Sequence, residues 1–449
     1  MRSICSSFSL YSKMWRGVMC GIAGVWNVDA SYNILHDILL GLQHRGQEST
    51  GIILENFRIV KEKGLVSQVL TQKNYIPGKI GIGHVRYSTF GENTEIQPLM
   101  GLTSKGKFAI AHNGNIPDAM QRMKSLIEKG AVFNTTIDTE IFLHYISLAP
   151  YADPKLSVQW TLSRIPGAFS VLILTEKMLI AARDSFGFRP LFYGKYRDGY
   201  VISSEDAPLI SIGAKDITEI IPGEMVIFSE NGMEKTKFAT TKMHFCAFEY
   251  IYFSRPDSNF FYGNVHKVRF KMGEILFKES NMKGDVVIPI LDSGFSGALG
   301  FSAASKIPIE LGLMRNRYLG RSFIMPEKRE EIVKRKLIPI PQVIKDKEVV
   351  LIDDSIVRGT TMKQIVKMLR ENGAKKVKVG IHSPPVIGPC PYGIDTSRKN
   401  ELIASQKKLD EIIKEINADE LHYLSIDGLK KAIGGDNLCL GCLNLNYPI

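Results

Sequence analysis

Residues 349–361, VVLIDDSIVRGTT, determine the fold of the second half of the chain. An apolar run ends in two carboxylates, Asp353 and Asp354, and a short polar loop then leads into a helix. Four apolar residues recur there at the spacing of one helix face: Met362, Ile365, Val366 and Leu369. Strand-like runs at 286–290 and 377–381 lie on either side. This alternation of strand and helix predicts a parallel, doubly wound α/β sheet.

The polar loop after this strand has the residues of a phosphate site. A helix N-terminus presents unpaired N–H groups to an anion. Four residues add hydroxyl groups or allow close backbone approach: Ser355, Gly359, Thr360 and Thr361. Paired aspartates suit ribose hydroxyls and a hard cation such as Mg²⁺. The alternative is a turn at the sheet edge followed by a capped helix.

The charge of the chain also indicates an anionic partner. The 449 residues include 57 basic and 46 acidic side chains, a formal charge of +11. Ten Lys/Arg and four Asp/Glu between Met314 and Lys347 account for +6 of this excess. Only Tyr318 and Phe323 could stack on bases there, so a small polyphosphate is favoured over nucleic acid. A solvated basic face is the alternative.

The composition also indicates where the protein resides. No apolar run reaches the ~18 residues that a membrane span needs, so we expect no membrane partner. Six cysteines are too sparse for a secreted disulfide framework, which favours a cytoplasmic protein. Residues 1–19 are basic and serine-rich, and we expect them to be a removed or untranslated leader.

The first half of the chain has a different pattern. Short β-type runs alternate with glycine-rich turns, at 80–83, 108–111, 169–174 and 200–203. This spacing predicts stacked, mainly antiparallel sheets. Two helical stretches, 34–42 and 139–147, interrupt the runs. We therefore expect an α+β domain over 20–250 and an α/β domain over 251–449.

Cys20 follows a methionine and could become the first residue of the mature chain. Its α-amine would have a pKa near ~8 and could act as general base for its own thiol. Asn113 and Gly114 could donate to an oxyanion, while Arg86 and Asp138 could bind the α-groups of an amino acid. Taken singly, each of these features could be structural, as a buried cysteine, a turn or a salt bridge.

The order of these motifs resembles the glutamine amidotransferases with an amino-terminal nucleophile cysteine, from Cys20 to about Glu249. The resemblance implies an αββα domain in which Cys20 forms a thioester with glutamine. It implies Asn113 and Gly114 as the oxyanion hole. Arg86 and Asp138 would bind the glutamine α-groups. Arg45 and Gly46 would line the pocket.

The second half is similar to the type I phosphoribosyltransferases, which bind phosphoribosyl pyrophosphate (PRPP). The resemblance implies that the 292–294 turn binds pyrophosphate and that a flexible loop within 315–336 closes over PRPP. Ser293, Asp353 and Asp354 would hold one Mg²⁺ per subunit. The implied PRPP ligands are Asp292, Ser293, Gly294, Arg317, Arg321, Asp353, Asp354, Ser355, Arg358, Gly359, Thr360 and Thr361. Arg335 and Lys336 would add charge to the loop.

Four further cysteines have no catalytic context: Cys246, Cys390, Cys439 and Cys442. Their spacing leaves Zn²⁺, a [4Fe–4S] cluster, a redox pair and unligated thiols open. The family resemblance implies one [4Fe–4S] cluster per subunit, because one branch carries a cluster on cysteines placed in this way.

The two resemblances together imply a cytoplasmic enzyme that makes 5-phosphoribosylamine, glutamate and pyrophosphate from glutamine, water and PRPP, the first committed step of purine synthesis. Purine nucleotides would be feedback inhibitors, and the chain would form a homo-oligomer. Two rival interpretations are another glutamine amidotransferase, such as a sugar-phosphate aminating enzyme or asparagine synthetase, and a non-catalytic PRPP sensor. A sensor would have no reason to keep Cys20, Asn113 and Gly114 together.

Overall fold

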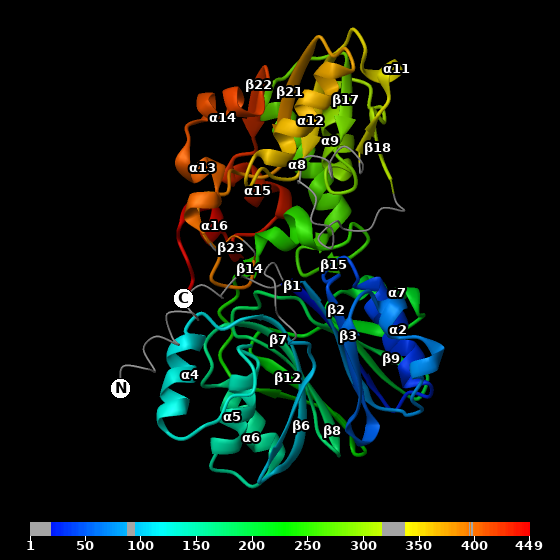
Figure 1. Cartoon of the computed structure of the whole chain (residues 1–449), viewed down its shortest axis with the longest axis vertical. Coiled ribbons are helices and arrows are strands. Elements are labelled where there is room, and N and C mark those ends of the chain that lie inside the picture. The colour runs from blue at the N-terminus through cyan, green and yellow to red at the C-terminus, as the bar shows by residue number, and fades with distance from the viewer. Residues whose placement is uncertain (1–18, 88–94, 317–336, 395, 397) are drawn as a thin grey trace.

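A computed structural model describes residues 19–87, 95–316, 337–394, 396 and 398–449. The chain forms two lobes, one above the other (Figure 1). The first lobe contains two antiparallel sheets, and the second contains a parallel sheet. The C-terminal segment does not end at the far side of the second lobe but returns to the junction between the lobes (Figure 1).

The first sheet of the lower lobe has seven antiparallel strands with β1 at its centre. Their spatial order is β11 (Lys215–Glu219), β9 (Phe192–Tyr196), β10 (Gly199–Ser203), β1 (Met19–Trp26), β4 (Gly81–Tyr87), β2 (Ser49–Leu54) and β3 (Arg58–Lys63). Cys20 on β1 lies opposite Arg86 on β4, and Arg86 in turn lies opposite Ser49 on β2. The register therefore places two predicted site residues side by side.

The second sheet of this lobe has six antiparallel strands. Their order is β13 (Gly232–Lys237), β12 (Glu224–Ser229), β8 (Met178–Arg183), β7 (Ala168–Leu174), β6 (Gly106–Asn115) and β5 (Leu99–Thr103). The two sheets pack face to face through apolar residues that include Ile22 and Ile202 of the first sheet and Ala111 and Leu172 of the second. Burial of these side chains holds β1 and β6 against each other.

Helices cover the outer faces of both sheets. The first sheet carries α2 (Ser31–Gly41), α3 (Val66–Val69) and α7 (Asp206–Ser211). The second carries α4 (Ala119–Glu128), α5 (Glu140–Leu148) and α6 (Pro154–Leu162). Short 3₁₀ turns, η1 (Glu55–Phe57) and η2 (Gln72–Asn74), complete the lobe. The predicted αββα architecture is confirmed, and the helices expected at 34–42 and 139–147 are α2 and α5.

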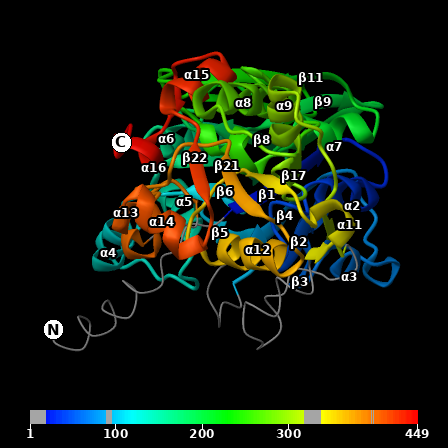
Figure 2. The ribbon, with the colours of Figure 1, turned by 90° about the horizontal axis from the view of Figure 1, so that it is seen from above.

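The second lobe contains the predicted parallel sheet, in the order β17 (Val286–Pro289), β20 (Glu348–Asp353), β21 (Lys376–Ile381) and β22 (Glu420–Tyr423). Successive residues of β20 point to opposite faces. Val350 and Ile352 pack in the cluster with α8 (Val265–Ser280), α9 (Phe295–Ser305) and α15 (Ile426–Ile433). Val349 and Leu351 pack in the cluster with α12 (Thr360–Glu371) and α14 (Leu409–Ile416). Figure 2 shows these helices on both sides of the sheet.

Smaller elements surround this sheet. A hairpin of β18 (Leu313–Arg315) and β19 (Leu337–Pro339) brackets residues 317–336, which lie outside the described chain. The remaining elements of the lobe are α11 (Pro341–Ile344), η5 (Lys399–Glu401) and α13 (Ile403–Gln406).

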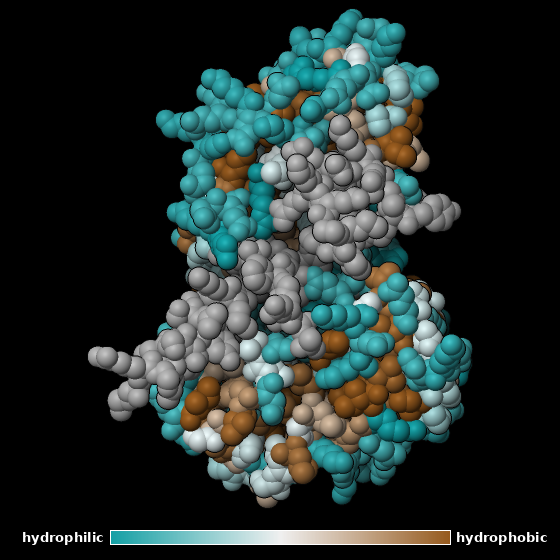
Figure 3. Space-filling model, viewed as in Figure 1, coloured by the Kyte–Doolittle hydropathy of each residue, from teal (hydrophilic) through white to brown (hydrophobic). Residues whose placement is uncertain are grey.

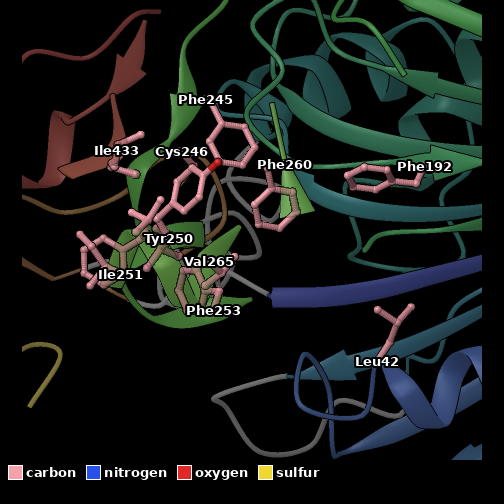
Figure 4. Packing of buried hydrophobic residues seen from close by; sticks show 14 of the residues in the cluster. Leu42, Phe192, Phe245, Cys246, Tyr250, Ile251, Phe253, Phe260, Val265 and Ile433 are labelled. Atoms are coloured by element: carbon pink, nitrogen blue, oxygen red, sulfur yellow. The ribbon is translucent and has the colours of Figure 1, made fainter. Parts of the chain in front are cut away.

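The two lobes share one apolar core at their junction. There β14 (Phe245–Cys246) pairs in parallel with β23 (Leu438–Cys439), so the C-terminal segment lies against the segment that leaves the first lobe. The other junction elements are η3 (Glu249–Phe253), β15 (Asn259–Phe260), β16 (Gly263–Asn264) and α16 (Gly441–Asn444). The rings of Phe245, Tyr250 and Phe260 lie 5.3–5.6 Å apart (Figure 4). The boundary predicted at 250/251 falls inside η3 and this core.

The surface differs between the lobes in the view of Figure 3, where polar residues cover most of the second lobe and apolar ones reach the surface of the first in several places. Within the described ranges, we find no helix with the length and apolar character that a bilayer crossing would require.

Candidate active sites

The first candidate site lies where the two sheets of the lower lobe face each other. Cys20 on β1 has a side chain that is 1% exposed. Asn113 and Gly114 are at the end of β6 in the facing sheet, next to Phe169 and Ser170 of β7. Contact between β1 and β6 brings the cysteine strand and the predicted oxyanion strand together. The fold thus places the predicted nucleophile and the predicted oxyanion donors on facing strands that contact each other.

The predicted oxyanion donors have the properties that this role needs. The Asn113 amide nitrogen is buried and has no hydrogen-bond partner among the described residues. A buried amide that donates to nothing is costly unless a ligand completes it. Gly114 has φ +150°, and a Cβ there would lie 1.9 Å from the Ala168 carbonyl oxygen. Only glycine fits at this buried position, where the strand passes close to the Ala168 backbone.

Arg86 and Asp138 do not form an ion pair with each other among the described ion pairs, so the simple structural alternative fails. The Arg86 guanidinium donates through Nη1 to the Glu95 carbonyl, while its buried Nε has no partner in the described chain. Asp138 Oδ2 accepts from the Ile116 N–H at 2.9 Å, next to the Asn113 strand. A buried donor thus lies on the strand beside the cysteine, and a held carboxylate lies beside the Asn113 strand.

Arg45 has no free guanidinium, because its side chain is engaged inside the protein, and its place at the glutamine pocket stays a prediction. Its side chain is 0% exposed and is paired with Glu205 and Glu249. Nε donates to the Cys20 carbonyl oxygen at 3.0 Å. Arg45 therefore holds the backbone of the cysteine. Gly46 packs tightly on β4, since a Cβ there would lie 2.5 Å from the Arg86 backbone nitrogen.

The second candidate site lies at the carboxyl end of β20. Asp353 and Asp354 are both buried, and burial together with the charge of Asp354 raises the pKa of Asp353. Gly359 takes the left-handed conformation, with φ +78°, and α12 begins at Thr360. Gly294 packs on this strand end, where a Cβ would lie 2.5 Å from the Ile352 carbonyl oxygen. The 292–294 turn and the 353–361 loop therefore meet.

Two predicted PRPP ligands already have protein partners. Asp292 forms an ion pair with Arg315, and the Arg358 guanidinium donates to Glu401 at 2.5 Å and 2.9 Å. These pairs use Nε and Nη2 of Arg358 and Oδ2 of Asp292. The loop positions Arg317, Arg321, Arg335 and Lys336 lie outside the described residues.

Sequence reasoning did not identify the charged residues buried between the sites, Arg189, Glu205, Glu249 and Arg269. For two of them, the sequence around the residue does indicate a buried charge. Glu249 is the single charge in the apolar string 245–253, and Arg189 follows the aromatic string 186–188. A lone charge in such a string must find a buried partner.

The four non-catalytic cysteines converge at the junction. Cys246 and Cys439 are cross-strand partners in the β14–β23 pair, and Cys390 packs in the clusters of both. Burial and the thiols of Cys390, Cys246 and Cys439 raise the pKa of Cys442. Burial also raises the pKa of Cys246, to about 11. Among the described residues, however, no three His, Cys, Asp or Glu side chains are arranged to hold a metal ion.

The four cysteines nevertheless have the chemical character of ligands to a thiolate-bound metal centre. Four sulfurs, of three buried cysteines and the half-buried Cys390, come from three segments, and the three others lie near enough to affect the pKa of Cys442. Soft thiolates are the ligands of zinc and of iron–sulfur clusters. The positions of the thiols alone do not choose between these centres.

Comparison with known proteins defines the class of the chain as a glutamine amidotransferase fused to a phosphoribosyltransferase. A family model described as a glutamine amidotransferase domain matches residues 84–211. A second, described as a phosphoribosyl transferase domain, matches residues 263–383.

Full-length relatives identify the particular family. The chain is 43% identical to the amidophosphoribosyltransferase of Bacillus subtilis, covering 96% of this chain and 94% of that protein. It is 46% identical to that of Pyrococcus horikoshii, covering 96% of both. The solved structure of glutamine PRPP amidotransferase from B. subtilis, complexed with ADP and GMP, matches with a TM-score of 0.90 at 44% identity, over 96% of this chain and 97% of that one. The chain belongs to the amidophosphoribosyltransferase family.

The activity follows from this membership. The enzyme uses glutamine and PRPP to make 5-phosphoribosylamine, glutamate and pyrophosphate, the first committed step of purine synthesis. The rival interpretations as another glutamine amidotransferase or as a non-catalytic sensor are excluded.

Proposed function

We propose that the lobes divide the reaction, with glutamine hydrolysed at Cys20 and PRPP aminated at the 353–361 loop. The Cys20 thiol attacks the glutamine amide carbon, and the free α-amine of the same residue takes the thiol proton. The Asn113 amide and the Gly114 N–H stabilise the oxyanion. Collapse releases ammonia, and water then hydrolyses the thioester to glutamate. The unpartnered amide of Asn113, close to the cysteine strand, is the observation that carries this assignment.

Arg86 and Asp138 hold the glutamine in this proposal. The buried Arg86 Nε supports binding of the α-carboxylate, and the Asp138 carboxylate suits the α-ammonium group. Gly46 supplies close backbone approach at the β4 wall. A free α-amine at Cys20 requires removal of residues 1–19, because a peptide nitrogen is not basic. Intact mass of the active enzyme should therefore correspond to a chain that starts at Cys20.

In the second lobe, ammonia attacks C1 of PRPP and pyrophosphate leaves. The N-terminus of α12 and the residues Ser355, Gly359, Thr360 and Thr361 hold the 5-phosphate. The 292–294 turn, with the loop arginines Arg317 and Arg321, holds the pyrophosphate, and Arg358 adds charge nearby.

Asp353 and Asp354, with Ser293, would hold Mg²⁺, which when bound neutralises charge on the departing pyrophosphate. Two adjacent buried carboxylates fit such a cation.

We further propose one [4Fe–4S] cluster on Cys246, Cys390, Cys439 and Cys442. The convergence of four thiols at the junction supports it, although the thiols would have to move to ligate it. Purine nucleotides are proposed as feedback inhibitors, because the related B. subtilis enzyme was solved with ADP and GMP. Assembly into a homo-oligomer remains a prediction.

The division of labour is tested by two opposite variants. Cys20→Ala should lose glutamine use and keep synthesis from added ammonia, because the nucleophile acts only in the first half-reaction. Asp353→Asn should keep basal glutamine hydrolysis and lose synthesis from either nitrogen source. Pyrophosphate release and glutamate production are measured side by side. Equal loss of both activities in Cys20→Ala would contradict the proposal.

A further inference from the structure

Four buried charged side chains connect the Cys20 strand to the lobe junction: Arg45, Arg189, Glu205 and Glu249. We call them the junction charge cluster. Each has a side chain that is at most 1% exposed. Two cations face two anions, so the cluster is neutral as a unit. Buried charges are stable only when paired in this way, so no member can be lost without leaving another uncompensated.

The inner end of the cluster lies at the nucleophile. The three guanidinium nitrogens of Arg45 are all engaged. Nε donates to the Cys20 carbonyl at 3.0 Å, Nη1 donates to Glu205 at 2.6 Å and to Glu249 at 2.9 Å, and Nη2 donates to Glu249 at 2.7 Å. The planar guanidinium fixes these directions together. The Cys20 carbonyl carbon is bonded to Cα, which carries the amine directly and the thiol through Cβ, so this contact fixes the backbone from which both reacting groups extend.

The outer end lies in the segment that follows the first lobe. Glu249 accepts from the Ser254 hydroxyl at 2.7 Å. Glu205 accepts from the Ser258 hydroxyl at 2.6 Å and from the Arg255 N–H at 3.0 Å. This segment is anchored in the shared core by Tyr250 and Phe253 (Figure 4).

Two arginines, Arg269 and Arg189, extend these contacts into the second lobe. Arg269 of α8 donates to the Tyr250 carbonyl at 2.6 Å and to the Ser254 carbonyl at 2.9 Å. Arg189 pairs with Glu249 at 3.1 Å and donates to the Tyr392 carbonyl at 2.8 Å. The cluster, whose members all belong to the first lobe, is therefore hydrogen-bonded to the second lobe through Arg189 and to the connecting segment through Glu249.

We propose that Arg45, Glu205 and Glu249 are positioning residues for the glutaminase half-reaction, which fix the Cys20 backbone from the lobe junction. The proposal rests on the assignment of Cys20 as the nucleophile and adds residues that do not touch glutamine. These residues align the thiol and the amine of Cys20. Substituting them should therefore lower kcat for glutamine, while glutamine binding and synthesis from ammonia stay intact.

The decisive variant is Arg45→Lys. Lysine keeps the buried positive charge, but one ammonium cannot reach both carboxylates and the Cys20 carbonyl together. We expect kcat for glutamine to fall by about 10-fold or more, in line with the cost of ~1 Å misplacement, with KM nearly unchanged. Ammonia-dependent pyrophosphate release should stay near that of the wild type, while the thermal unfolding midpoint should fall, because one buried carboxylate loses its partner. Alkylation of Cys20 by an electrophilic glutamine analogue should slow in proportion.

Ser254→Ala is the second variant, because it removes only the hydrogen bond to Glu249 and tests the junction end if Arg45→Lys does not fold. It should lower kcat for glutamine and leave both the KM for glutamine and ammonia-dependent pyrophosphate release nearly unchanged. Glu234→Gln is the matched control, since it breaks the exposed Lys155–Glu234 pair of the same lobe, and all its activities should stay normal.

Unchanged kcat for glutamine in the folded variants, or equal loss of both activities, would overturn the proposal. Cys20→Ala in the same assays separates the two assignments. If it keeps glutamine use, the nucleophile is wrong. If it loses glutamine use while the positioning variants keep kcat, only the positioning role fails.

Discussion

At the scale of single residues, the site is recognisable by side chains that the folded protein leaves incomplete. The buried Asn113 amide and the Arg86 Nε have no partner among the described residues. A buried donor without an acceptor costs about 1–3 kcal/mol, which a protein tolerates where a ligand completes the bond. By contrast, Arg45 looked equally available in the sequence and is fully occupied.

Asn113→Ala should slow glutamine hydrolysis by about 10²–10³, the usual cost of one oxyanion donor. The loss should fall on kcat, because the oxyanion exists only after attack. Steady-state glutaminase assays measure it, and synthesis from ammonia is the internal control. A variant that changes only the KM for glutamine would place Asn113 in substrate binding instead.

His84 should make the protein less stable in mild acid. It is fully buried beside Arg86, and burial first, then the charge of Arg86, lowers its pKa from 6.5 to about 3. Below pH 6.5 the unfolded chain therefore binds a proton that the folded chain does not. The unfolding free energy should fall by roughly 1.4 kcal/mol per pH unit from this group as pH decreases.

Urea unfolding from pH 7 to pH 4.5 tests this expectation against His84→Gln, whose amide does not titrate and can still donate to the His112 carbonyl. The variant should show a shallower pH dependence by about one proton. Identical slopes for the two proteins would mean that His84 takes up a proton in the folded state.

At the scale of elements, the approach of α8 and α9 positions the pyrophosphate turn. The helices touch through glycine, since a Cβ on Gly300 would lie 1.8 Å from the Phe270 carbonyl oxygen and one on Gly273 would lie 1.8 Å from that of Gly297. Because α9 begins at Phe295, directly after the 292–294 turn, the separation of the helices sets the position of that turn.

Gly300→Ala should push α9 away from α8. We expect a loss of about 1–3 kcal/mol in unfolding free energy, typical of overpacking, and a higher KM for PRPP. Ala303→Ser, on the exposed side of the same helix, is the matched control. Denaturant unfolding and PRPP kinetics report the two effects. A normal KM in a destabilised variant would show that the turn is independent of α9.

At the scale of the whole molecule, the C-terminal segment joins the lobes. It returns to pair β23 with β14 and brings Cys439 and Cys442 to Cys246 and Cys390. The Cys390 loop also reaches the first lobe, where the Asn115 amide donates to the Pro391 carbonyl at 2.7 Å. A metal centre at this point would add folding free energy to both lobes at once.

The purified protein should accordingly be brown, with about four irons per chain. Cys442→Ser should lose the iron and lower solubility and both activities together, since none of these thiols takes part in either reaction. Iron analysis and the visible spectrum measure this. Stoichiometric zinc without colour would keep the four-ligand site and reject the cluster, while a metal-free and fully active protein would reject the site.

The sequence alone predicted both architectures, which the structure confirms, and the candidate residues of both sites. The strand–helix alternation around Asp353 and Asp354 predicted the parallel sheet, and the short runs of the first half predicted the stacked antiparallel sheets. These features could be predicted because they depend on local periodicity and on turn residues that are neighbours in the chain. Cys20, Asn113 and Asp138 are distant in the chain, and they were predicted to form one site because the order of their motifs resembles that of a known family.

Only the tertiary structure decided which charges are available to substrates. Arg45 and Glu249 are 204 residues apart, and nothing local to either shows that they form a buried pair. Arg358 likewise pairs with Glu401 across 43 residues. The shared core that places η3 and the four cysteines at the junction also depends on distant segments meeting. Such pairings are set by how the two lobes pack, because burial strengthens a charge interaction only once the surrounding chain has excluded water.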